Sequence, residues 1–165
     1  MTTATTDDIL GYLAMLVEKL ERFAVTVLPP DDREEISLGQ ERNGNLIIDL
    51  DARLPAPHGS DDVELDLFER WRSVEQDLWI RIEYKYELRH HELGYRRAFH
   101  RHHADHFVRM HDVATHEHCE STLGIKACDH YYGEPVADAF DGFERLYGLW
   151  LTDRAPDCSL LHCLS

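Results

Sequence analysis

The segment from Leu78 to Leu88 repeats with a period of two residues. Six apolar residues occupy every second position, and four of the five residues between them are charged. The apolar set is Leu78, Ile80, Ile82, Tyr84, Tyr86 and Leu88, and the intervening set is Trp79, Arg81, Glu83, Lys85 and Glu87. Successive side chains of a β-strand point to opposite faces of its sheet. The segment therefore predicts a long strand with one buried face.

The same alternation returns after the turn "RHHELG". It places Ala98, His100 and His102 on one face of a second strand, with Tyr95, Arg97, Phe99 and Arg101 on the other. A further extended run, from near Phe107 to Cys119, places Ala114, His116 and His118 on one face. Earlier in the chain, Asn43-Gly44 lies between two apolar runs and predicts a type I′ hairpin turn, because both residues accept a positive φ.

Two other segments have the periodicity of helices. Apolar residues three and four apart predict a helix over about residues 6–25, with Thr6 as its cap and Pro29-Pro30 beyond its end. Pro135 precedes an apolar stripe that predicts a second helix over about residues 135–151. The predicted fold is α+β: an antiparallel sheet of about five to six strands across about residues 36–130, with both helices packed on it. Residues 1–165 are predicted to form one domain, with a tail at 154–165.

The chain is strongly acidic. It has 32 Asp and Glu residues against 17 Lys and Arg, which gives a net charge of -15, and its only lysines are Lys19, Lys85 and Lys126. Strong nonspecific binding to DNA is not expected, because it requires clustered positive charge. We favour adaptation to high salt, as in a halophilic protein, as the explanation of this negative charge. The alternative is mimicry of nucleic-acid phosphates by an inhibitor, which the scattered placement of the acids disfavours.

The sequence also bears on location. The first residues, "MTTATTDD", are polar and acidic, unlike a secretory signal, and no apolar run approaches the ~18 residues of a membrane span. We therefore expect a cytoplasmic protein that does not enter membranes. Its four cysteines are then expected to be free thiols or metal ligands rather than disulfides, with Cys158 and Cys163 in a packed terminal segment.

Seven histidines lie between Tyr95 and Ser121. If the two strands that carry them pair antiparallel, the four imidazoles of His100, His102, His116 and His118 come within a cross-strand reach of about 5 Å. Such a cluster is expected to be neutral, to bind a metal or to bind an anion. The plainer interpretation, which the sequence favours, is a row of histidines on a partly solvated sheet face.

A second constellation overlaps the first. Cys119 and Cys128 flank an expected turn at Leu123-Gly124, and a histidine follows two residues after Cys128. Thiolates and imidazoles are the ligands of structural zinc. The candidate ligands are His116, His118, Cys119, Cys128 and His130. Cys119 needs a β-bulge to reach the side of His118. A buried pair of small apolar cysteines is the interpretation we favour over zinc.

The histidines also suit catalysis without a metal. One imidazole takes the proton of a ribose hydroxyl, a second protonates the leaving oxygen, and an arginine stabilises the developing charge. The candidate bases are His100, His102, His116 and His118, with Glu117, Glu120, Arg96, Arg97 and Arg101 nearby in the sequence. The alternative for the arginines is pairing with the abundant carboxylates.

Three short motifs resemble the TumE toxin family of toxin-antitoxin systems. Tyr84, Tyr86 and Leu88 match its "Y-x-Y-x-L" strand, His102 and His103 match the histidine pair of its return strand, and His116 with His118 match a later "H-x-H". The resemblance covers about residues 79–151, and Ala98-Phe99 stand where the family has Asp-Asn. The chain is also similar to uncharacterised proteins of haloarchaea.

Two hypotheses follow. The first, implied by the resemblance, is a toxin-like protein that acts on RNA as a ribonuclease-like hydrolase, with a cognate antitoxin or another protein as partner. The second is a noncatalytic interaction or regulatory protein whose histidine-rich sheet face is either simply polar or stabilised by zinc. The sequence does not decide between an enzyme and a binding protein.

Overall fold

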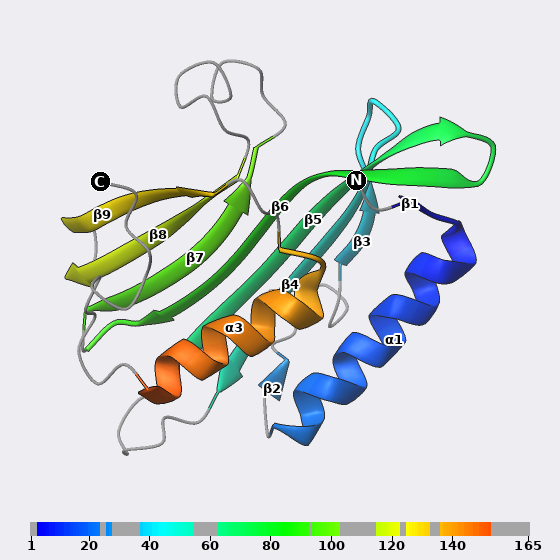
Figure 1. The fold of residues 1–165 in the computed structure, drawn as a ribbon. Helices are drawn as coiled ribbons and strands as arrows, with labels where there is room; N and C mark the ends of the chain where they lie inside the picture. The colour runs from blue at the N-terminus through cyan, green and yellow to red at the C-terminus, as the bar shows by residue number, and fades with distance from the viewer. Residues whose placement is uncertain are drawn as a thin grey trace.

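An antiparallel sheet with two helices on one face forms the body of the protein (Figure 1). The computed structural model describes residues 3–23, 26–27, 37–54, 63–92, 94–102, 115–122, 125–132 and 136–152. The elements in chain order are β1 (Thr3–Ala4), α1 (Thr6–Arg22), β2 (Thr26–Val27), β3 (Ser37–Gln40), β4 (Leu46–Leu54), β5 (Val63–Glu75), β6 (Leu78–His90), β7 (Tyr95–Arg101), β8 (Thr115–Thr122), β9 (Ile125–Tyr132) and α3 (Ala139–Thr152).

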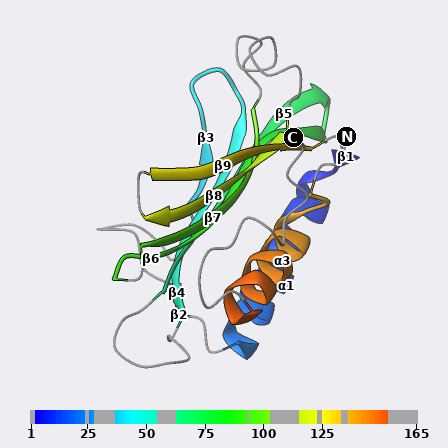
Figure 2. The same ribbon diagram turned by 60° about the vertical axis from the view of Figure 1, so that its left-hand side comes forward.

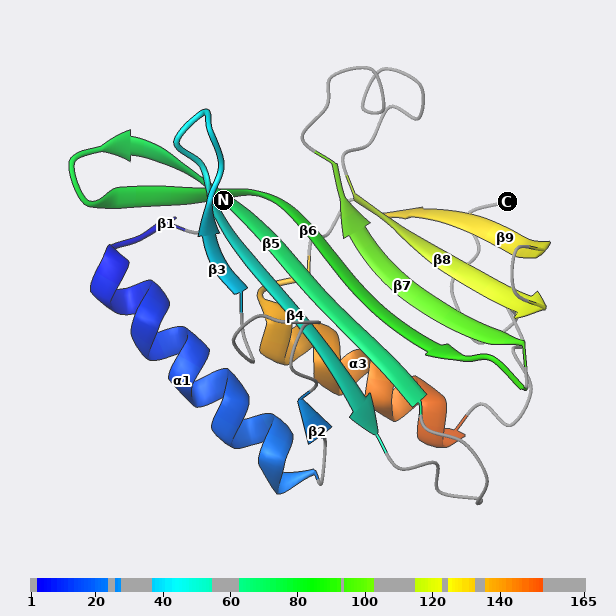
Figure 3. The same ribbon diagram turned by 180° about the vertical axis from the view of Figure 1, so that it is seen from behind.

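The strands run in the order β2-β4-β5-β6-β7-β8-β9, with β1 beside β6 and β3 beside β4. From β4 onward each strand pairs antiparallel with the next along the chain. The predicted α+β class and antiparallel sheet are confirmed, although the nine described strands exceed the five to six expected. Helices α1 and α3 lie on the same face of the sheet (Figure 2). No helix of the described ranges covers the other face, which we call the open face (Figure 3).

The two longest strands, β5 and β6, show what the alternation predicted and what it missed. Sequence analysis did not single out β5, although its first nine residues alternate between buried and half-buried. The predicted strand from Leu78 is confirmed as β6, but its alternation is interrupted. Arg70 pairs with Glu83 while Trp71 pairs with Arg81, so β6 carries one extra residue between these pairs. Such a bulge redirects side chains, and Arg81 is buried.

The cap residue of helix α1 lies one residue earlier than predicted. The Thr5 hydroxyl accepts a hydrogen bond from the Asp8 backbone amide at 3.2 Å, and the Asp8 carboxylate accepts one from the Thr5 amide at 2.9 Å. This reciprocal pair is a capping box, so Thr5 and not Thr6 is the cap. The helix ends at Arg22 rather than near residue 25, and it buries Ile9, Leu13, Leu16 and Leu20.

Helix α3 begins at Ala139, four residues later than predicted. The Asp141 amide donates to the Asp138 carboxylate at 2.9 Å, so Asp138 caps the helix. The helix then packs closely on the sheet. A Cβ atom added to Gly142 would lie 2.4 Å from Cδ2 of Tyr86, which means that the helix backbone rests directly on the Tyr86 ring.

Other predictions have mixed outcomes. Strands β3 and β4 form the predicted hairpin, but only Gly44 has a positive φ, of 87°, so its turn is not type I′. The predicted run from Phe107 to Ala114 and the predicted tail at 154–165 with Cys158 and Cys163 lie outside the described residues. No helix in the described ranges is both long and apolar enough to cross a lipid bilayer.

Candidate functional site

Strands β7 and β8 pair antiparallel, as the histidine hypothesis required. His100 lies directly opposite His116, and Ala98 lies opposite His118. Because Phe99 belongs to the core beneath the helices, its neighbour His100 points to the open face. The ring centroids of His100 and His118 are 4.7 Å apart, and those of His100 and His102 are 5.8 Å apart. At least three of the four predicted imidazoles therefore meet on the open face.

The cluster is more enclosed than a row of solvated histidines. His100 is only 9% exposed, although it lies on a face that carries no described helix. His102 and His118 are half-buried. Burial lowers the pKa of His100, and the nearby Glu87 carboxylate opposes this shift only in part. The His100 ring is therefore expected to be neutral at neutral pH, as a general base must be.

A buried carboxylate lies beside these histidines. Glu87 is 1% exposed and lies opposite Ala98 in the register, so only a methyl side chain separates it from the position of His118. Its Oε2 accepts a hydrogen bond from Arg96 at 2.6 Å and lies 3.5 Å from Nε2 of His100. Its Oε1 pairs with Arg89.

The contacts around Glu87 keep its carboxylate charged. Burial alone would favour the protonated carboxyl, but the contacts with His100, Arg96 and Arg89 outweigh burial and hold the pKa of Glu87 well below its usual range. Sequence analysis missed Glu87, because it read this residue as part of the polar face of β6. The sequence feature that could have indicated Glu87 is the small side chain of Ala98, which lies between Glu87 and His118. Recognising it requires the strand register, which the sequence does not give.

Three residues proposed to assist the histidines lie on the opposite face. Arg97, Arg101 and Glu117 pair in the register with the core residues Leu88, Tyr84 and Phe99. Residues opposite each other in a sheet share a face, so these three point towards the helices. Both Arg97 and Glu117 are fully buried there. Arg96 is the one predicted arginine that lies with the histidine cluster.

The predicted zinc site stays a prediction. Within the described parts of the chain, no group of three or more His, Cys, Asp or Glu side chains is placed to hold a metal ion. The structure does not describe the side chains of four candidate ligands, His116, Cys119, Cys128 and His130. Strands β8 and β9 form the predicted hairpin, and Cys119 lies opposite Cys128 in its register. The register is regular from His118 to Cys119 and shifts only after Cys119, so the bulge that the zinc hypothesis required does not lie between these two residues.

A second buried carboxylate lies on the helix side of the sheet. Glu69 is 1% exposed, and its side chain accepts four hydrogen bonds, from Tyr12, Arg81, Tyr86 and Trp71. The Tyr12 and Arg81 bonds are 2.9 Å and 2.8 Å long. Burial and the Glu69 carboxylate raise the pKa of Tyr12 and of Tyr86, so both hydroxyls keep their protons and donate.

The same centre ties α1, the sheet and the start of α3 together. The Arg81 guanidinium also donates to the backbone oxygens of Val136 and Ala137. The Tyr12 hydroxyl accepts a hydrogen bond from the Ala139 amide at 2.9 Å. Each charged group of this centre is thus engaged by fixed protein partners, which is typical of a structural element.

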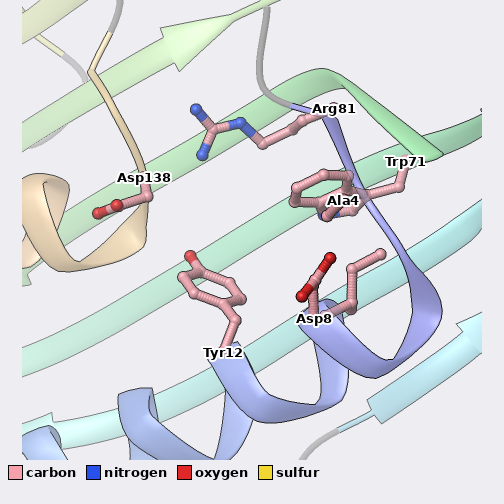
Figure 4. Close-up of a pocket in the computed structure, with 7 residues that line it drawn as sticks. Ala4, Asp8, Tyr12, Trp71, Arg81 and Asp138 are labelled. Atoms are coloured by element: carbon pink, nitrogen blue, oxygen red, sulfur yellow. The ribbon is translucent and has the colours of Figure 1, made fainter. Parts of the chain in front are cut away.

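A small pocket of about 180 Å³ lies beside this centre (Figure 4). Tyr12, Trp71 and Arg81 line it, together with Asp8 and Asp138. The Asp8 carboxylate already accepts from the Thr5 amide in the capping box of α1, and Asp138 caps α3. The Arg81 guanidinium is held by Glu69, Tyr86 and the backbone. The pocket therefore offers little polar capacity for a ligand, and the open-face histidines remain the stronger candidate site.

Comparison of the chain with protein-family models, with curated proteins and with solved structures finds no match.

Proposed function

We propose that the protein cleaves RNA through the histidine cluster of the open face, as a toxin-like ribonuclease. The observation that carries the proposal is the close approach of the His100 and His118 rings, at 4.7 Å between centroids. Phosphodiester cleavage needs a general base and a general acid close together. Two neighbouring imidazoles, one of them buried and neutral, can supply both. The resemblance to TumE toxins supports the same activity.

The reaction uses the two imidazoles in sequence. Neutral His100 takes the proton of a ribose 2′-hydroxyl, whose oxygen attacks the adjacent phosphorus. Protonated His118 gives its proton to the 5′-oxygen as the P–O bond breaks, so the products are a 2′,3′-cyclic phosphate and a 5′-hydroxyl. Arg96, on the same face, stabilises the charge that develops on the phosphoryl oxygens. His102, whose ring centroid lies 5.8 Å from that of His100, and His116, which is opposite His100 in the register, are expected to position the RNA.

The setting of this activity is part of the proposal. An acidic chain of net charge -15 is suited to a salt-rich cytoplasm, and high salt screens its repulsion of RNA. A cognate antitoxin is the expected partner, and covering the open face is the direct way for it to stop cleavage. Co-expression from the adjacent reading frame, followed by purification, tests whether such a partner binds.

Cleavage of a labelled single-stranded RNA by the purified protein tests the activity. We expect products that end in a 2′,3′-cyclic phosphate and no cleavage of DNA of the same sequence, because DNA lacks the 2′-hydroxyl. His100→Ala and His118→Ala are each expected to lower the rate by about 100-fold or more. The control is His91→Ala, which removes an exposed histidine that directly follows β6 and whose side chain pairs with Glu64.

Two outcomes contradict the proposal. A folded wild-type protein that leaves RNA intact under low and high salt would make the histidine face a noncatalytic interaction surface. Full activity in a folded His100→Ala/His118→Ala variant would place the chemistry elsewhere in the chain. Circular dichroism of each variant establishes that it is folded before its rate is compared.

A further inference from the structure

We infer that the protein dimerises through the outer side of helix α1, with two copies of this helix packed antiparallel. The occupant of this surface is therefore a second copy of the same chain. The inference goes beyond the proposed ribonuclease activity and does not depend on it, because α1 lies on the helix side of the sheet, away from the open face (Figure 2). It rests on the exposure, the spacing and the charges of the α1 side chains.

The outer side of α1 carries an apolar patch. The nine residues from Ile9 to Val17 are all uncharged, in a chain of which 30% is charged. Part of this stretch is buried against the sheet, but Leu10 is 47% exposed and Met15 is 57% exposed. Gly11 and Ala14 are exposed beside them. We call these four exposed residues the α1 patch. A contiguous apolar patch on an acidic protein indicates an interaction surface.

The shape of the α1 patch suits close packing of two helices. In the described part of the chain, no atom lies within 4 Å of a Cβ atom placed on Gly11. Ala14 adds only a methyl group, whereas its neighbour Met15 has a long and adaptable side chain. If a twofold axis passes between Ala14 and Met15, the Met15 side chain of each copy lies over Ala14 of the other. The large exposed side chain then meets a small one.

The charges of α1 are complementary about the same axis. Asp7 lies seven residues before Ala14, and Arg22 lies seven residues after Met15. Seven residues are about two helical turns, so each charge shares a face with its patch residue. In the antiparallel pair, Asp7 of one copy faces Arg22 of the other at both ends. A twofold contact requires such a self-complementary surface.

Arg22 is accessible for this contact. Its side chain is 72% exposed, and within its own helix it pairs with Glu18. A guanidinium group has five N–H donors, so Arg22 can bridge Glu18 of its own helix and Asp7 of the second copy. A parallel pair would instead bring Asp7 next to Asp7, and like charges in contact are unfavourable. The charges therefore favour the antiparallel arrangement.

The net charge of -15 opposes self-association, but its range is limited. At about 0.15 M salt the screening length is about 8 Å, so distant charges of two copies interact weakly while pairs in contact persist. Contact between two helices of 17 residues gives an interface at the small end of the range for stable complexes. The expected dimer is therefore weak and reversible, with a dissociation constant in the micromolar range.

Sedimentation equilibrium of the full chain at about 0.15 M salt tests the inference. We expect a reversible monomer–dimer equilibrium. Met15→Glu places two carboxylates near the twofold axis and is expected to raise the dissociation constant about tenfold or more. The matched control is Leu151→Glu, which puts the same charge at a similarly exposed apolar position of α3, outside the α1 patch. It is expected to leave the dissociation constant unchanged.

Exchange of the end charges tests the antiparallel register. Asp7→Arg alone, or Arg22→Asp alone, puts like charges opposite each other, so each is expected to weaken the dimer about fivefold or more. The double variant Asp7→Arg/Arg22→Asp makes the facing charges opposite again. Its dissociation constant should therefore lie closer to that of wild type than to that of either single variant. Circular dichroism establishes that each variant is folded.

Three outcomes contradict the inference. A folded wild-type chain that stays monomeric up to about 1 mM has no dimer of the expected affinity. A dimer that Met15→Glu leaves intact, or that Leu151→Glu weakens as much, uses another surface. If the double charge variant dimerises no more tightly than the single variants, Asp7 and Arg22 do not face each other and the antiparallel arrangement is wrong.

Discussion

Two buried carboxylates of the sheet, Glu69 on β5 and Glu87 on β6, are equally inaccessible and differ in their partners. Glu69 lies under the helices and accepts from two tyrosines, a tryptophan and Arg81, none of which changes charge near neutral pH. Glu87 lies on the open face between Arg89, Arg96 and His100, and the last of these is a group that exchanges protons in this range.

The two faces of the sheet therefore have different roles: the Glu69 centre stabilises the fold, and the Glu87 centre belongs to the candidate site. The hydrogen bonds of the Glu69 centre connect α1, β5, β6 and the start of α3. This centre therefore stabilises the packing of these elements. The ion pairs that Glu87 makes with Arg89 and Arg96 join the neighbouring strands β6 and β7, which the backbone ladder already holds. Changes at the two centres are expected to have different consequences.

The largest effect on stability is expected from Arg81→Met. This change leaves Glu69 buried and without its ion pair, and breaking such a pair costs about 3–5 kcal/mol. Arg70→Met is the matched control, because Arg70 is on the neighbouring strand and its pairs with Glu41 and Glu83 are partly exposed. Its cost is expected to stay within about 1 kcal/mol. Urea unfolding measures both, and equal costs would contradict a structural role for the Glu69 centre.

A smaller effect is expected from Gly142→Ala in α3. The added Cβ would collide with the Tyr86 ring, whose hydroxyl donates to Glu69, and overpacking of this kind costs about 1–3 kcal/mol. In the same helix, Gly148 has open space at its Cβ position. Gly148→Ala should instead stabilise the protein by about 0.5–1 kcal/mol. If thermal unfolding shows the same sign for both variants, α3 does not rest on Tyr86 as described.

An effect of similar size is expected from Glu87→Gln, but it depends on pH. Because the pKa of Glu87 is depressed in the fold, its ionised form contributes stability above the unfolded value of about 4.5 and loses it as the pH falls below that value. The variant should be less stable than wild type by about 1–3 kcal/mol at pH 7, and the gap should close below about pH 4.5. If the difference in the free energy of unfolding is the same at pH 7 and pH 3, the ionised form of Glu87 does not stabilise the fold.

Burial of His100 acts in the same direction on the wild-type protein. Its lowered pKa means that the unfolded chain binds protons more readily, so stability should begin to fall as the pH drops through the unfolded value of 6.5. Asp66 opposes this trend, because burial raises the pKa of its carboxyl despite the contact with Lys85. Comparison of each variant with wild type at the same pH removes these shared contributions.

The sequence predicted elements whose pattern is local. The alternation from Leu78 predicted β6, and the two-residue spacing of the histidines predicted that His100 and His102 share a face. Turn chemistry was less informative, since Asn43-Gly44 identified a hairpin but not its type. The start of α3 was placed too early because Pro135 is a weaker boundary signal than the Asp138 cap.

The rest depends on contacts between strands. Arg81 occupied a polar position of the alternation, and only the bulge opposite Arg70 and Trp71 brings it to Glu69. Glu87 also belonged to the polar set, and nothing local indicates that the side chains of the open face bury one another. Register determines both centres, and register is a property of paired strands rather than of one segment.

The central claim is that substrate meets the open face and not the helix side. Its most direct test is a ¹⁵N-histidine NMR titration with a single-stranded RNA blocked by 2′-O-methyl groups, so that it binds without being cut. The account predicts that the ring signals of His100, His102 and His118 move, while those of His91 and of His90, which stacks on Trp150 beneath α3, stay in place. Shifts at His90 without shifts at His100, or no shifts at saturating RNA, would contradict it.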